Sequence, residues 1–197
     1  MSARDTILST VRRNQPAAVP LPAVPLFDAN LPPLWPLFVE SLQRMGGKLA
    51  EPAADADLNT LVAALFPAAA VVCSAAPEVS GNRPLATIAE PRQLDDVDVG
   101  VVRAAFAVAE TGSVYLSEAE LGVNAIGYLA QHLVCLLDPA DVIGNLHHAY
   151  ARPEFRSARY AVLMTGPSAT ADIEGVLIHG AQGVRSLTIV AAPRRLT

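Results

Sequence analysis

The sequence predicts an α/β domain with a mostly parallel sheet flanked by helices. Short, continuous apolar runs, of the kind that form strands buried on both faces, recur over residues 71–74, 133–137 and 187–191. Segments with apolar residues at helical spacing lie between such runs, and this alternation is typical of a parallel sheet. The 197 residues are 52% hydrophobic and 17% charged, which fits one domain with a sizeable core and excludes a disordered chain.

Residues 1–30 are predicted to form a proline-rich arm outside this domain. Residues 1–14 favour a short helix. Seven prolines between Pro16 and Pro36 predict an extended chain over 15–27, because each proline fixes its own φ and disfavours a helical residue before it. Apolar residues alternate with these prolines, so we expect the arm to lie over a surface of this chain or of a partner. The α/β domain itself is expected over residues 31–197.

The first half of the domain shows an alternation of helices and strands. Asn30 is a suitable N-cap for a helix whose apolar residues recur at helical spacing, and Gly46 and Gly47 end it. The other elements predicted here are a strand over 48–50, a helix from Asp57 to Pro67 and a strand over 71–74.

The second half is rich in strands. The run 99–109 is apolar except for Arg103 and predicts a strand, and a second strand over 113–116 follows the break at Glu110-Thr111-Gly112. The remaining predicted elements are a strand over 133–137, a helix over 140–152, a strand over 160–165, a helix over 170–179 and a strand over 187–191.

Composition argues against several classes of function. A net charge of −5 without a basic stripe, and aromatic residues at only 5%, argue against a nucleic-acid binder. The uncharged stretch 58–77 is split by Pro67, and the N-terminus lacks the apolar run of a signal peptide, so we expect no membrane insertion and a cytoplasmic protein. Cys73 and Cys135 lie in apolar strands, and the four histidines lack metal-ligand spacing, so no metal site is predicted.

The strongest local signal lies where the strand over 160–165 is expected to lead into a helix, in the sequence TGPSATADIEG. Ligands of open α/β sheets bind at such strand exits. Gly166 allows close approach of the backbone, and Ser168 and Thr170 bring hydroxyls to the free amides of a helix start, which would bind a carboxylate or phosphate. Ordinary helix capping by these two hydroxyls is the alternative.

A second polar segment, AETGS at residues 109–113, contains Glu110 and separates two apolar strands. Its carboxylate would face a cleft as an acid, a base or a ligand contact, and a simple turn is the alternative. His132 precedes a buried strand and would face the same cleft, or else serve as a hydrogen-bonded structural histidine. His147 and His148 are most simply explained as a solvated helix face.

These segments resemble the lactate utilisation protein C family, the LUD domain, in their order and spacing. The matching sequences are AETGS at 109–113, QHLV at 131–134 and GPSATADIEG at 166–175, and the resemblance covers about residues 95–192. It implies a NagB/RpiA/CoA-transferase-like fold and a part in oxidation of L-lactate to pyruvate together with two iron–sulfur proteins. Because a cluster usually needs four thiolates, this chain would carry no cofactor of its own, and the clusters would be on the partner proteins.

Motifs and resemblance together predict a site for a small carboxylate metabolite. The catalytic candidates are Glu110, His132 and Glu174. The substrate-binding candidates are Thr111, Gly112, Ser113, Gly166, Pro167, Ser168, Thr170 and Asp172. The family commonly has arginine where this chain has Ala169, and without that guanidinium carboxylate binding would be weaker.

Two other functions remain open alternatives. The first is a stand-alone enzyme of the same fold group that acts on a phosphorylated or acyl metabolite, with Glu110 or Glu174 as base or nucleophile. The second is a non-catalytic assembly subunit whose arm docks on a partner. A homodimer is compatible with all three functions.

Overall fold

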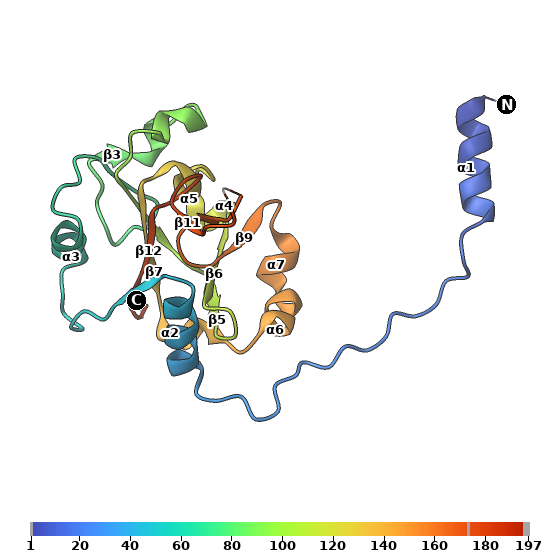
Figure 1. The fold of residues 1–197 in the computed structure, drawn as a ribbon, viewed down its shortest axis with the longest axis horizontal. Helices are drawn as coiled ribbons and strands as arrows, with labels where there is room; N and C mark the ends of the chain where they lie inside the picture. The colour runs from blue at the N-terminus through green and yellow to red at the C-terminus, as the bar shows by residue number, and fades with distance from the viewer. Residues whose placement is uncertain (1, 173, 195–197) are drawn as a thin grey trace.

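The computed structural model describes residues 2–172 and 174–194 and builds the domain around two β-sheets (Figure 1). The larger sheet has six parallel strands in the order β1-β12-β7-β4-β2-β3. These strands are β1 (Lys48–Ala50), β2 (Val72–Ser74), β3 (Arg83–Pro84), β4 (Val99–Arg103), β7 (His132–Leu137) and β12 (Ser186–Ala191). The predicted α/β class with a mostly parallel sheet is confirmed.

A smaller, mixed sheet has the order β8-β5-β6-β9. Strand β6 is antiparallel to both β5 and β9, whereas β5 and β8 are parallel. Its strands are β5 (Phe106–Val108), β6 (Ser113–Ser117), β8 (Val142–Ile143) and β9 (Ala161–Met164). A separate two-stranded hairpin pairs β10 (Ala169–Thr170) with β11 (Ile178–His179).

Helices cover the outer faces of the two sheets. The helix α3 lies on one side of the domain and α6 and α7 lie on the other, with the sheets between them (Figure 1). The α-helices are α1 (Ala3–Arg13), α2 (Leu34–Arg44), α3 (Leu58–Leu65), α4 (Glu118–Leu121), α5 (Ile126–Leu129), α6 (Leu146–Ala151) and α7 (Pro153–Ser157). The 3-10 turns are η1 (Leu85–Thr87), η2 (Pro91–Leu94) and η3 (Pro139–Asp141). No helix in the described ranges combines the length and the apolar character that crossing a bilayer requires.

The parallel sheet is buried on both faces, as its continuous apolar strands predict. Successive side chains of a strand point to opposite faces. Thus Val99 and Val101 of β4 pack with Val62 of α3, whereas Val102 of β4 and Cys135 of β7 belong to the core between the two sheets. A third cluster joins the far face of the smaller sheet to α6 and α7, so the core has three layers.

The apolar run 99–109 does not form one strand. The backbone N–H of Ala104 donates to Leu136 of the larger sheet (N···O 2.9 Å), and the next one, of Ala105, donates to Tyr115 of the smaller sheet (3.3 Å). The chain therefore leaves one sheet for the other between two adjacent alanines. Hydrophobicity alone predicts burial at these positions, but it does not specify which sheet a residue joins.

One predicted helix is only partly confirmed, and another is wrong. Residues 140–152 instead form η3, β8 and the short α6, because Asn145 begins a new helix by accepting a hydrogen bond from the backbone of His148. Residues 170–179 form no helix in the part that is described, since β10 and β11 pair as a hairpin. Glu174 and Gly175 have φ values of 52° and 70°, which a right-handed helix does not contain.

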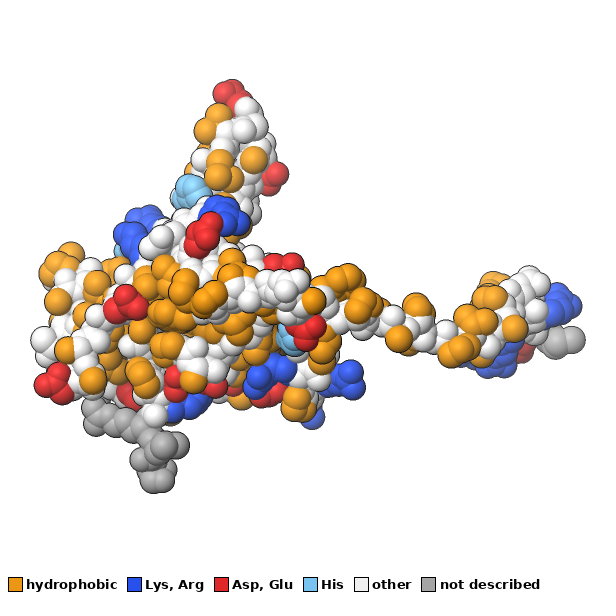
Figure 2. Space-filling view, turned by 90° about the horizontal axis from the view of Figure 1, so that it is seen from below, with side chains coloured by type: hydrophobic (Ala, Val, Ile, Leu, Met, Phe, Trp, Pro, Cys, Tyr) orange, Lys and Arg blue, Asp and Glu red, His pale blue; other side chains and the backbone are white. Residues whose placement is uncertain are grey.

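The arm extends away from the domain and ends in α1 (Figures 1 and 2). The helix predicted at the N-terminus is confirmed, with Ser2 and Asp5 forming its capping box. Leu21 is 92% exposed and Val19 is 79% exposed, so this part of the arm does not lie over its own domain, and the alternative, a partner's surface, stays a prediction. Asn30 is not the N-cap of α2; it has a φ of 67° in a turn, and Pro33 holds the N-cap position.

Candidate functional site

Glu110 lies in a tight turn between β5 and β6, held against α2 and α6. Its backbone N–H donates to the carbonyl of Gly144 (3.0 Å), and the Oγ of Ser41 in α2 donates to the carbonyl of Glu110 (3.3 Å). Its carboxylate accepts a hydrogen bond from the backbone N–H of Leu146 at the start of α6 (3.1 Å). The backbone of Glu110 is thus fixed by Gly144 and Ser41, whereas its side chain is held by the Leu146 N–H and remains solvent-exposed.

A chain of hydroxyls lies beside this carboxylate. Ser113 Oγ donates to Thr111 Oγ1 (2.7 Å) and also shares a short hydrogen bond with Thr165 Oγ1 at the end of β9. Ser113 is only 2% exposed, so its hydroxyl is fixed between the two threonines. A hydroxyl can donate and accept, and such a chain can therefore reorient its hydrogens to match a bound anion.

Two neighbouring hollows open beside Glu110. The first, here called the hydroxyl hollow, has a volume of about 390 Å³, and its lining residues are Ser41, Arg44, Met45, Glu110, Thr111, Ser113, Leu146, Leu163 and Thr165. The second, here called the arm hollow, has a volume of about 540 Å³, and its lining residues are Phe27, Leu31, Leu37, Ser41, Arg44, Glu110, Asn145 and His147. Ser41, Arg44 and Glu110 line both hollows, so these three residues stand at their junction.

Ser41 and Arg44, both on α2, were not singled out from the sequence. Arg44 pairs with Glu40 one helical turn away (2.8 Å), and its side chain is 62% exposed. Basic residues favour the last turn of any helix, so nothing local distinguishes Arg44 from an ordinary helix end. Only the packing of α2 on the Glu110 turn brings a guanidinium to the site. Thr165 opens the TGPSATADIEG segment but was not among the candidate site residues, although a polar residue at the end of an apolar strand is a usable signal.

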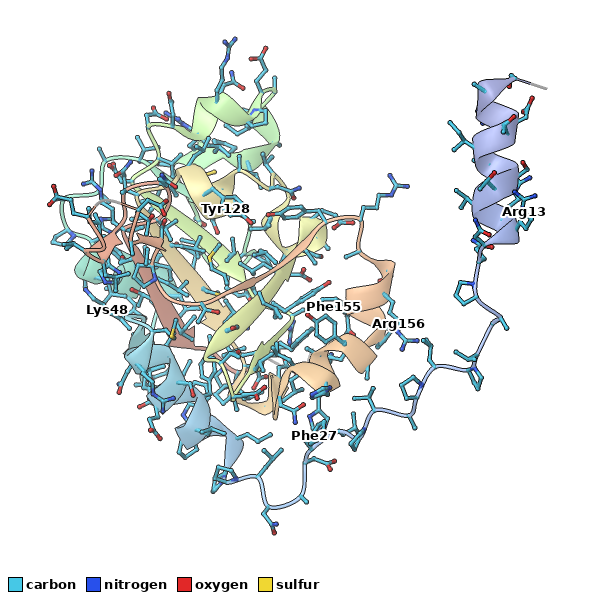
Figure 3. All side chains as sticks on the ribbon, turned by 45° about the vertical axis from the view of Figure 1, so that its right-hand side comes forward. Arg13, Phe27, Lys48, Tyr128, Phe155 and Arg156 are labelled. Atoms are coloured by element: carbon cyan, nitrogen blue, oxygen red, sulfur yellow. The ribbon has the colours of Figure 1, made fainter. Side chains whose placement is uncertain are left out.

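The arm meets the domain at the arm hollow. Phe27 lies where the arm reaches the body of the domain (Figure 3), with its ring 4.9 Å from that of His147. Asn145, which is 4% exposed, donates through Nδ2 to the carbonyls of Leu26 (2.6 Å) and Phe27 (3.4 Å). These contacts hold Phe27 at a φ of 51°, a conformation that non-glycine residues rarely adopt.

The described part of the segment 166–175 does not begin the predicted helix, so its amides are not presented at a helix start. The strand before it, β9, is in the smaller sheet, and the segment continues into the β10–β11 hairpin. The backbone N–H of Ser168 donates to the carbonyl of Val184 (2.9 Å), and the carbonyl of Ser168 accepts from Gly180 (2.7 Å). The amide that was expected to bind a ligand is therefore already used within the protein.

The other candidates in this segment fall into two groups. Buried Gly166 sits against α2: a Cβ there would lie 2.1 Å from the carbonyl oxygen of Met45, and Pro167 contacts Gly46 nearby. Asp172 and Glu174 are exposed on the hairpin, and the Oγ1 of Thr170 accepts a hydrogen bond from Asp172. Among the described residues, neither hollow is lined by any member of the 166–175 segment.

His132 begins β7 and also stays outside the two hollows. Its Nδ1 shares a hydrogen bond with Ser186 Oγ (2.8 Å), and its ring packs on that of Phe66 at 4.9 Å. Burial lowers the pKa of His132, and the nearby Arg185 and Lys48 lower it further. The ring is thus a packed, hydrogen-bonded group at the amino end of the parallel sheet.

We predict that His132 makes the domain less stable at mildly acidic pH. Between its ordinary pKa of 6.5 and its lower folded value, the unfolded chain binds the proton and the folded chain does not. The free energy of unfolding must therefore fall as the pH drops through this range. Urea unfolding at pH 7, 6 and 5 should show a smaller decline for His132→Asn than for the wild type. Equal declines in the two proteins would contradict this.

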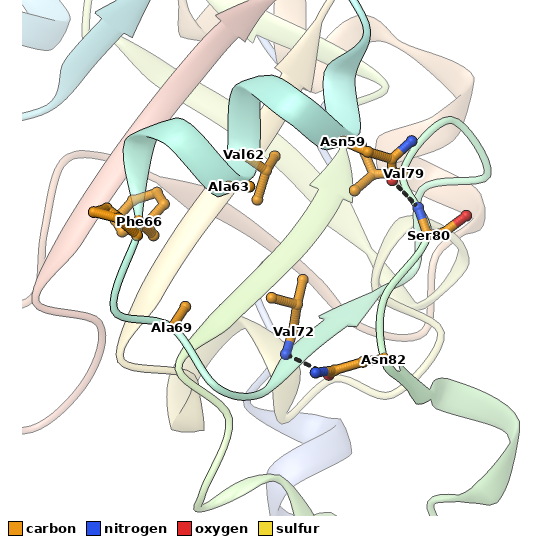
Figure 4. Close-up of a pocket in the computed structure, with 10 residues that line it drawn as sticks. Asn59, Val62, Ala63, Phe66, Ala69, Val72, Val79, Ser80 and Asn82 are labelled. Carbon is orange, nitrogen blue, oxygen red and sulfur yellow. Dashed lines mark hydrogen bonds between the residues drawn. The ribbon is translucent and has the colours of Figure 1, made fainter.

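Two further hollows have walls less suited to an anionic ligand. One of about 770 Å³ lies at the carboxyl ends of β4 and β12, but each of its arginines is held by both a carboxylate and a backbone carbonyl: Arg103 by Glu78 and Ala192, and Arg194 by Asp141 and Ala104. The other, of about 230 Å³, lies between α3 and β2 and has no ionisable side chain among its described lining residues (Figure 4). Its asparagines bond the backbone of Ser80 and Val72.

The two cysteines are core residues, as predicted. Both Cys73 and Cys135 are fully buried, and burial raises the pKa of Cys135 to about 12, so it stays a neutral thiol. Within the described ranges, no three side chains of the His, Cys, Asp or Glu type are arranged as metal ligands.

Comparison with known proteins identifies the family. The family model of the LUD domain matches residues 87–191, which include the Glu110 turn, His132 and the 166–175 segment. Over 101 residues the chain is 27% identical to lactate utilization protein C of Deinococcus radiodurans; this match covers 50% of the chain and 48% of that protein. Helix α2, with Ser41 and Arg44, lies before the matched family region.

A solved structure supports the same fold. The crystal structure of a DUF162 family protein from Deinococcus radiodurans aligns with a TM-score of 0.59 and 17% identity, over 81% of this chain and 96% of that one. The family model spans more than half of the chain, and the fold agrees with it. The chain therefore belongs to the LUD domain family.

Proposed function

We propose that this protein is a component of a lactate utilisation system and binds a 2-hydroxy or 2-oxo acid in the hydroxyl hollow. The observation that carries this proposal is the lining of the hydroxyl hollow. The guanidinium of Arg44 and the carboxylate of Glu110 line it together with three linked hydroxyls, those of Thr111, Ser113 and Thr165. The similarity to a protein named lactate utilization protein C supports the choice of acid.

Each group has a distinct part in this proposal. Arg44 binds the carboxylate of the acid, because a guanidinium matches the geometry of a carboxylate. Arg44 thereby replaces the arginine that the family commonly has where this chain has Ala169. The hydroxyls donate to the remaining ligand oxygens. Glu110 accepts the hydrogen of the 2-hydroxyl group and is placed to act as a general base.

Electron transfer is assigned in this proposal to partner proteins. Both cysteines of this chain are fully buried, on β2 and β7, which argues against an iron–sulfur cluster held by these two thiols; the clusters are proposed on two partner proteins because the family resemblance implies them. The part of this chain is then to bind the acid and to handle its proton.

We predict that Glu110→Gln abolishes lactate-dependent growth when it replaces the wild-type chain in a strain that lacks it. Glutamine keeps an oxygen that can accept from Leu146 but is no base, so the local structure should persist while proton handling is lost. Growth on lactate as sole carbon source is the measurement, with thermal unfolding as a check that the variant folds.

Ser168→Ala is the matched control for this experiment. The sequence alone places Ser168 in the site, whereas the structure leaves it outside both hollows with its backbone hydrogen-bonded. Growth should therefore continue with Ser168→Ala and stop with Glu110→Gln. The reverse pattern would move the site to the 166–175 segment and refute the proposal.

A further inference from the structure

We infer that the arm hollow is a second compartment of the same site, which takes an apolar or aryl side chain of the bound acid. This inference rests on the proposed function, because Arg44 and Glu110 must hold the carboxylate and the hydroxyl of that acid. It extends the substrate class from lactate to 2-hydroxy or 2-oxo acids with larger side chains, and it makes Phe27 a determinant of specificity.

The two hollows adjoin at the residues that would bind the acid. Arg44, Ser41 and Glu110 line both of them, so a ligand anchored there faces the hydroxyl hollow on one side and the arm hollow on the other. The walls of the two hollows differ in polarity. The hydroxyl hollow contains three linked hydroxyls, whereas the arm hollow is walled by Phe27, Leu31, Leu37 and the ring of His147.

The space exceeds the needs of lactate. Volumes of about 390 and 540 Å³ fall within the range of pockets that enclose drug-sized ligands. Lactate has only a methyl group beyond its two anchoring groups and would leave the arm hollow to water. A larger side chain would displace that water and bury apolar surface against Phe27 and the leucines, which is favourable.

The outer wall of the arm hollow is fixed in place. Phe27 is 62% exposed, so its ring is not packed away in a core and is accessible at the hollow that it lines. Its backbone is nevertheless held by Asn145 Nδ2, and its ring lies 4.9 Å from that of His147. On the same wall, Leu31 packs against Gly144, where a Cβ would come within 2.4 Å of Leu31 Cδ1.

The matched pair of L-lactate and L-3-phenyllactate tests this inference directly. The two acids share the carboxylate and the 2-hydroxyl and differ by one phenyl ring. Titration calorimetry on the full chain should give phenyllactate an affinity at least about 10-fold higher, a factor that one methylene can already provide in an apolar pocket. Phe27→Ala should remove most of this gain, so that the affinities for the two acids become nearly equal.

Two further variants complete the experiment. Leu21→Ala removes an apolar side chain from the same arm, at a position 92% exposed and outside the hollow, and should change neither affinity. Arg44→Ala should weaken the binding of both acids. Equal affinities of the two acids, or a gain that survives Phe27→Ala, would overturn the second compartment while the proposed function stands. If neither acid binds, the proposed carboxylate site fails, and the compartment fails with it.

Discussion

Gly112→Ala should destabilise the domain by about 3–5 kcal/mol, a large part of the stability of an ordinary domain. Gly112 is buried at a φ of 67° and is the last residue of the Glu110 turn. A Cβ there would lie 2.3 Å from the backbone nitrogen of Leu42 and 2.6 Å from the carbonyl carbon of Ser41. These are backbone atoms of α2, which cannot rotate away as a side chain would, so the helix must shift.

Gly175→Ala measures the cost of backbone strain alone, without the overlap between an added Cβ and the backbone of α2. Gly175 has a similar φ of 70°, but no atom lies within 4 Å of its added Cβ. It should therefore cost only the strain of the left-handed conformation, about 1–2 kcal/mol.

Urea unfolding measures both glycine variants. The protein has a single tryptophan, Trp35, which is on α2 and stacks on Phe38 at 5.6 Å, so its fluorescence reports whether that helix is docked. Similar losses of stability in the two variants would show that α2 does not pack against Gly112 as described.

Arg44→Ala should weaken the binding of L-lactate or pyruvate by about 10- to 100-fold. A hydrogen bond to a charged group contributes about 1.5–3 kcal/mol, and each 1.4 kcal/mol is a factor of about ten. Arg44→Lys should recover part of the loss, because lysine keeps the charge but not the planar fork. The fold should be unaffected, since the exposed pair with Glu40 contributes at most about 0.5 kcal/mol.

Variants of two other charged residues, Glu40 and Arg92, make this experiment more specific. Glu40 competes with the ligand for Arg44, so Glu40→Gln should tighten binding rather than weaken it. Arg92→Ala is the control: Arg92 is 82% exposed, pairs with Glu90 and lines neither hollow. Calorimetry of acid binding is the measurement for all four variants. Binding by Arg44→Ala that matches Arg92→Ala would remove Arg44 from the site.

Elements with strong local signals were predictable from the sequence. Asp57 caps α3 by accepting hydrogen bonds from the backbones of Asn59 and Thr60, and Gly46 follows α2 with a φ of 82°. Strand β1 occupies the predicted residues 48–50. In each case, a side-chain cap, a glycine or a short apolar run acts within a few residues, and such contacts can be inferred from their order in the chain.

Elements whose hydrogen-bond partners are distant in the chain could not be predicted from the sequence. Nothing local to the run 99–109 shows that the chain changes sheets between Ala104 and Ala105. The 170–179 segment has the composition of a helix, but it pairs as a hairpin through a turn with positive φ at Glu174 and Gly175. Sequence periodicity indicates which residues are buried, whereas the choice of hydrogen-bond partner depends on segments far away in the chain.

The sequence by itself determined the α/β class, the membership of a family through its motifs, and the polar turn at Glu110. Only the tertiary structure decided which residues share a space with that turn: it brought Arg44 from α2, Thr165 from β9 and Phe27 from the arm, and it left His132 and Ser168 elsewhere. The physical reason is that a motif is a local pattern along the chain, whereas a binding site is formed by the packing of elements that are distant in sequence.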